Sequence, residues 1–129
     1  MLLPFFVTGN ASAQDAKLAL ALNNVQSEMS DCLAYYANIK ACVGTEDKEL
    51  SEGTQKTLDA LTLMAVKVGR SAGMTPDAMM SRLAMFQDEQ RELLKGSCAN
   101  MSSLFTRHAA RCKKVVQNGD AILDEYLKR

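Results

Sequence analysis

Four cysteines are the residues of this sequence most able to do chemistry, and their spacing limits what that chemistry can be. No two of them are three positions apart. The C-x-x-C motif of dithiol redox enzymes and of many zinc sites is therefore missing. An even number of cysteines without that motif is typical of structural disulfides in a small exported protein. The four residues are Cys32, Cys42, Cys98 and Cys112.

The single histidine, His108, is the other residue that could do chemistry. It lies four positions before Cys112, and one His with scattered cysteines does not provide the usual ligand spacing of a zinc site. His and Met can together hold a haem iron, which makes His108 and Met29 a candidate axial pair. A sequence with eight Met residues meets that description by chance. We therefore expect no metal and no cofactor.

Composition and charge exclude several classes of function. The 129 residues hold 15 Lys and Arg against 15 Asp and Glu, so the net charge is zero. The basic surplus typical of nucleic-acid-binding proteins is missing. The sequence also shows no Ser–His–Asp set, no paired acids and no Gly-rich phosphate loop. We expect neither catalysis nor a nucleic-acid partner, and a solvated helix face at the basic residues Arg107, Arg111, Lys113 and Lys114.

Apolar residues recur at helical spacing along the chain, and no alternating strand pattern occurs. The first apolar stripe indicates one long helix over residues 15–43. Further stripes predict helices over 51–71, 75–95 and 98–117, and a short helix after a break at Asn118. The first stripe consists of Leu18, Leu22, Val25, Met29, Cys32, Tyr36, Ile39 and Val43.

The third predicted helix carries the clearest signals at its two ends. Thr75 is a good N-cap, Pro76 fits the first helical position, and Asp77 suits the positive end of the helix dipole. The Gly96–Ser97 pair then indicates a stop followed by a new cap. The alternative is one long kinked helix over residues 75–117.

The connection between these helices decides the disulfide pairing. Ten residues of helix separate Cys32 from Cys42 by about 15 Å, whereas a disulfide needs Cα atoms within about 7 Å. Both bridges must then join the first long helix to the last one. In an antiparallel four-helix bundle the pairs are Cys32–Cys112 and Cys42–Cys98. In a three-helix order, Cys32 would pair with Cys98 and Cys42 with Cys112.

Short connections and similar helix lengths favour the four-helix order. We therefore expect an all-α fold: an antiparallel four-helix bundle with a short C-terminal helix, cross-linked by two interhelical disulfides. The bundle forms a single domain over residues 14–129.

Two short motifs surround the cysteines of the first and last long helices. One is the segment Asp31-Cys-Leu-Ala-Tyr-Tyr36, and the other runs from Asn100-Met-Ser-Ser-Leu104 to Cys112-Lys113. From about residue 25 onward, the chain resembles small, uncharacterised, exported all-helical proteins of Proteobacteria with a Cys-x-x-Tyr-Tyr signature. The resemblance implies a Cys32–Cys112 bridge and assigns no activity.

The N-terminal segment is typical of the end of an export signal. A short apolar run precedes Ala11-Ser-Ala13, and small residues at those two positions suit a signal-peptidase site. We interpret residues 1–13 as the remnant of an export signal whose true start lies upstream or was misassigned, and we expect a mature chain that begins at Gln14. The apolar run is too short for a membrane span. Periplasmic or secreted localisation follows from this interpretation and from the cysteines.

Methionines gather around the second and third predicted helices, where they could line an adaptable apolar groove. We expect an exported bundle that binds another envelope or secreted protein, or assembles in the envelope, with a homodimer as one form of assembly. The alternative is a carrier or chaperone-like binder of apolar ligands that uses this groove. The candidate groove residues are Met64, Met74, Met79, Met80 and Met85.

Overall fold

The computed structural model describes the backbone of residues 2–129 and the side chains of residues 13–129. This part of the chain is helical and contains no strand. The elements are α1 (Leu2–Val43), α2 (Lys48–Ser71), α3 (Pro76–Leu94), the 3-10 helix η1 (Cys98–Asn100), α4 (Met101–Gln117) and α5 (Gly119–Leu127).

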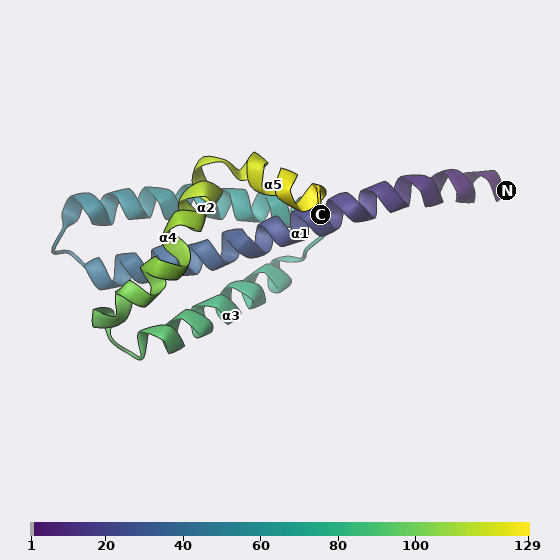
Figure 1. Ribbon diagram of the computed structural model, residues 1–129. Helices are drawn as coiled ribbons and strands as arrows, with labels where there is room; N and C mark the ends of the chain where they lie inside the picture. Colours follow the sequence, from purple (N-terminus) through teal and green to yellow (C-terminus); the bar gives the residue numbers. More distant parts are fainter. Residues whose placement is uncertain (1) are drawn as a thin grey trace.

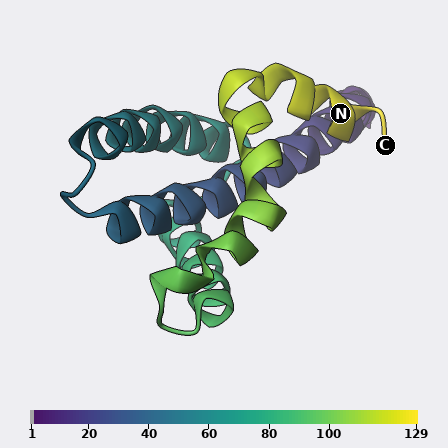
Figure 2. The same cartoon turned by 60° about the vertical axis from the view of Figure 1, so that its left-hand side comes forward.

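The long helix α1 forms the centre of the bundle. α2 and α3 form an antiparallel hairpin and lie on opposite sides of α1 (Figure 1). α4 crosses α1 obliquely, and α5 turns back along it (Figures 1 and 2). The expected all-α bundle with a short C-terminal helix is confirmed, with α1 as the helix that contacts all the others.

Because α1 is surrounded, it is buried on more sides than one apolar stripe indicates. Gln26, Ser30 and Tyr35 are all buried, although the stripe contains none of them. Tyr35 is only 3% exposed, whereas Tyr36, the tyrosine of the stripe, is half-buried. Leu18, at the start of the stripe, is exposed because the bundle does not cover that end of α1.

Local capping sets most of the helix ends. The Thr75 hydroxyl accepts a hydrogen bond from the Ala78 amide, as expected for the start of α3. Asp47 caps α2 in the same way, so α2 begins at Lys48, three residues before the predicted start. α1 begins at Leu2 rather than near Asp15, and Pro4 falls in its first turn, where a proline is tolerated.

The turn between α3 and α4 separates the two helices completely. Lys95 and Gly96 both have positive φ, at 50° and 72°, which ends α3 in a left-handed turn. The Ser97 hydroxyl then accepts a hydrogen bond from the Ala99 amide and starts η1. The alternative of one helix over residues 75–117 is therefore wrong.

Candidate functional site

Both disulfides of the four-helix order are present. The Cα atoms of Cys32 and Cys112 are 5.4 Å apart, and those of Cys42 and Cys98 are 5.5 Å apart. Fourteen residues of the C-terminal segment thus run beside ten residues of α1. The oblique crossing of α4 over α1 absorbs that difference (Figure 1).

The two disulfides differ sharply in their surroundings. Cys32 and Cys112 are 2% and 1% exposed and belong to the hydrophobic core. Cys98 is exposed at the corner between α3 and α4, and Cys42 is half-buried near the end of α1. One bridge is therefore part of the core, and the other lies at the surface.

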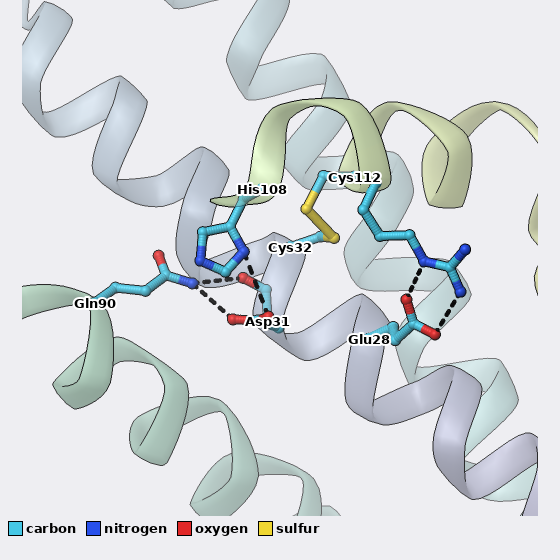
Figure 3. The surroundings of a disulfide bond; sticks show 7 residues. Glu28, Asp31, Cys32, Gln90, His108 and Cys112 are labelled. Carbon is cyan, nitrogen blue, oxygen red and sulfur yellow. Dashed lines mark hydrogen bonds and ion pairs between the residues drawn. A yellow bond between two sulfur atoms is a disulfide. The ribbon is translucent and has the colours of Figure 1, made fainter. Parts of the chain in front are cut away.

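A charged cluster joins α1, α4 and α5 beside the buried disulfide, and Figure 3 shows its α1 member, Glu28. Arg111 donates two hydrogen bonds to the Glu28 carboxylate, from Nε at 2.5 Å and from Nη2 at 2.9 Å. Its Nη2 also donates to Glu125 at 2.8 Å, and the Lys114 ammonium donates to the other Glu125 oxygen. The Tyr126 hydroxyl donates to Glu28. Paired donation from one guanidinium is a strong, geometrically specific contact.

These contacts shift the ionisation of the cluster. Burial alone would raise the pKa of the Glu28 carboxyl, but hydrogen bonds from Arg111 and Tyr126 bring that pKa below its ordinary value. Hydrogen bonds from Arg111 and Lys114 lower the pKa of Glu125 to about 2. Burial and the bond to Glu28 raise the pKa of Tyr126. The cluster therefore keeps the Glu28 and Glu125 carboxylates ionised and joins three helices by ion pairs.

The expectation for Arg111 as part of a solvated basic face is wrong. Its side chain is partly buried, and it links two carboxylates from different helices. Arg107 and Lys113 do lie exposed on α4. The sequence analysis missed the contact between Arg111 and Glu28 because these residues lie 83 positions apart in the chain.

His108 belongs to a second polar cluster on the other side of the same disulfide (Figure 3). Its Nδ1 lies 3.5 Å from Oδ2 of Asp31, an ion pair when the imidazole is protonated. The Gln90 amide donates to both the carbonyl and the carboxylate of Asp31, each at 2.8 Å. Asn38 donates in turn to Gln90 at 3.0 Å. Hydrogen bonds thus join Asp31 and Asn38 on α1 to Gln90 on α3, as expected for polar side chains packed between two helices.

An open cleft of about 930 Å³ lies beside this second cluster, between α3 and α4. Asp31 and His108 face it from α1 and α4, and Met85 faces it from α3. The remaining lining is largely charged and exposed. It includes Asp88, Glu89, Glu92 and Arg107.

The five candidate methionines do not share one surface. Met79 is buried, and its sulfur fills the space that a side chain at Gly69 would occupy. Met80 lies next to it on the surface of α3, 68% exposed. The other three lie elsewhere: Met64 lines a pocket against α5, Met74 contacts Arg82, and Met85 lines the charged cleft.

A narrow apolar groove of about 210 Å³ follows α1 between α2 and α3. Its floor is formed by α1 residues at helical spacing, including Leu33 and Ala37. Of the five candidate methionines, only Met79 and Met80 line it. The other lining residues are Gln26, Ser30, Leu58, Thr62, Ala65, Val66, Leu83 and Gln87.

Within the described residues, no three His, Cys, Asp or Glu side chains lie close enough to share a metal ion. None of the helices in that part of the chain combines the length and hydrophobicity that a membrane span needs. Two disulfides are consistent with an oxidising compartment. The chain matches no protein-family model, no curated protein and no solved structure.

Proposed function

We propose that this is an exported protein that binds an amphipathic helix of another envelope or secreted protein. The helix would occupy the apolar groove between α2 and α3. Export is supported by two disulfides, which cytosolic conditions disfavour, and by the small residues of Ala11-Ser-Ala13. Most of residues 1–13 lie outside the part whose side chains are described.

The groove is the observation that carries the proposal. α1 forms its floor and the two antiparallel helices α2 and α3 form its walls. Because Gln26 and Ser30 on the floor are already buried, a partner helix would rest on the two walls and reach α1 at the half-buried Ala37. The floor extends from Gln26 to Ala37, which is about 16 Å or three helical turns. Helix-in-groove recognition uses apolar side chains at that spacing.

The rim of the groove supports a protein partner as well. Met80, which lines the groove from α3, is 68% exposed. A helix seated between the two walls would cover Met80 together with the half-buried Val66 on α2. Groups of exposed apolar residues commonly mark interaction sites.

The apolar lining also favours a second candidate, a carrier of apolar small ligands. Its volume of about 210 Å³ lies below the roughly 300–1,000 Å³ of typical small-molecule pockets. A groove too small to enclose a ligand can still take apolar side chains of a helix that rests on its two walls, so a protein helix is the occupant that we propose.

Affinity capture from the exported fraction of the native host tests the proposal. The chain offers a matched pair of variants on one helix: Met80→Glu in the groove and Met85→Glu in the charged cleft, where Met85 is 49% exposed. We expect the same partner with wild type and Met85→Glu, and its loss with Met80→Glu. Equal capture by both variants would exclude the groove.

Two further measurements test for a different occupant of the groove and for processing of the N-terminal segment. Native mass spectrometry of the purified protein shows a second copy as a doubled mass, and a bound small ligand as an added mass. Either one, lost on Met80→Glu, would replace the partner helix by that occupant. Intact mass of the exported protein tests processing: a chain that begins at Gln14 supports the export signal, and retention of residues 1–13 contradicts it.

A further inference from the structure

The surface disulfide differs from the buried one in its access to other thiols. Cys98 is exposed at the corner between α3 and α4, and its partner Cys42 is half-buried. Cys32 and Cys112 are almost completely covered by core residues. Thiol–disulfide exchange requires a thiolate to reach a disulfide sulfur directly. Only one of the four sulfurs therefore belongs to a residue that is exposed in the folded protein.

We propose that the Cys42–Cys98 disulfide is a thiol–disulfide exchange site for a protein dithiol of the exported compartment. A thiolate of the dithiol attacks Sγ of Cys98, the bond between the two sulfurs breaks, and Cys42 leaves as a thiolate that takes up a proton. The second thiol of the dithiol then attacks the mixed disulfide. Cys98 is released as a thiol and the dithiol becomes a disulfide, so two electrons reduce the bridge.

The fold can tolerate this exchange, because other contacts hold α4 in place. Leu104 is fully buried in the core, and the Cys32–Cys112 bridge ties the middle of α4 to α1. Arg111 adds its paired hydrogen bonds to Glu28. Reduction of the surface bridge frees only the α3–α4 corner from the end of α1.

Access sets the expected difference in rate. The buried bridge reacts only from an opened state, whose population in a stable domain is about one in 1,000 or less. The surface bridge reacts from the folded state itself. We therefore expect its reduction to be about 1,000-fold faster, or more, at the same thiol concentration.

The test is graded reduction of the native protein with dithiothreitol, followed by alkylation and peptide mapping. We expect Cys42 and Cys98 to be alkylated first, with unchanged far-UV circular dichroism. Reduction with glutathione, a monothiol, should leave a mixed disulfide on Cys98 and a free thiol at Cys42. Joint reduction of both bridges, loss of helix at the first step, or glutathione on Cys42 would overturn the proposal.

A trapping experiment tests the protein dithiol itself. In Cys42→Ser the remaining Cys98 thiol is exposed, and its thiolate should attack the disulfide form of the host oxidoreductase, which releases one cysteine of that disulfide as a thiolate and leaves a mixed disulfide on Cys98. In Cys98→Ser the remaining Cys42 is half-buried, and we expect little or no trapping. A comparable yield from the two variants, or none from Cys42→Ser, would contradict a protein dithiol as the reaction partner.

Discussion

Replacing Cys32 and Cys112 together by alanine shows how the cross-links stabilise the bundle. The 56-residue separation of the surface bridge lies inside the 80-residue separation of the buried bridge. With the inner bridge intact, the outer one constrains only the 24 residues by which those separations differ. The chain-entropy relation gives about 3.4 kcal/mol for a loop of that length. For the inner bridge, Cys42–Cys98, the same relation gives a stabilisation of about 3.1 kcal/mol when the outer bridge, Cys32–Cys112, is already formed.

The two loop-entropy contributions are nearly equal, so the difference in burial between the two disulfides should decide which pair of substitutions costs more stability. Removing the buried sulfurs of Cys32 and Cys112 leaves a cavity in the core, which costs roughly 1 kcal/mol per sulfur. Removing Cys42 and Cys98 exposes less of the core, because Cys98 is already in solvent. We therefore expect destabilisation by about 5 kcal/mol for the buried pair and about 3 kcal/mol for the surface pair.

Denaturant unfolding of both double-alanine variants measures this difference. The chain contains no Trp, so far-UV circular dichroism of the helices is the appropriate signal. The surface-pair variant serves as the matched control for loss of a cross-link alone. Equal free energies of unfolding for the two variants, or a larger loss for the surface pair, would refute the reasoning from burial.

Acid and glycine substitutions give two further predictions. The pKa of Glu125 is about 2 in the folded protein, against an ordinary value of 4.5. Its stabilising effect is therefore complete above pH 4.5 and lost as pH falls toward 2. Unfolding midpoints in this range should vary less with pH in Glu125→Gln, and an unchanged slope would contradict the ion pair with Arg111. Gly53→Ala should stabilise α2 by about 1 kcal/mol, because nothing lies near its side-chain position. Gly69→Ala should gain less, because its Cβ would displace Met79; an equal gain in thermal unfolding would refute the close approach.

The sequence predicted the number and order of the helices and favoured the correct one of two possible disulfide pairings. Thr75 and the Gly96–Ser97 pair carry local signals, since a cap depends only on neighbouring residues. The pairing of Cys32 with Cys112 follows from the rise of the helices, once residues 75–117 are known to form two helices rather than one. Both inferences need only local helix geometry: the capping residues that end a helix, and the rise per residue that sets how far apart two cysteines lie.

The surroundings of α1 depend on tertiary contacts, and the sequence did not predict them. A single apolar stripe indicates a helix packed on one face, so the burial of Tyr35 and Gln26 was missed. The contact of Arg111 with Glu28 joins residues that are far apart in the chain. Similarly, methionine content predicted a groove, but only the packing of α2 and α3 on α1 shows that Met85 lies outside it.

Photo-cross-linking from inside the groove tests the proposed binding most directly. A photoreactive amino acid at Met80 points into the groove region, and the same residue at Met85 serves as the control on the opposite cleft. In the native host, we predict that Met80 cross-links to one exported protein and that the adduct maps to an amphipathic helix of that partner. The Met85 position should not give this adduct. The same adduct from both positions, or none from Met80, would contradict helix binding in the α2–α3 groove.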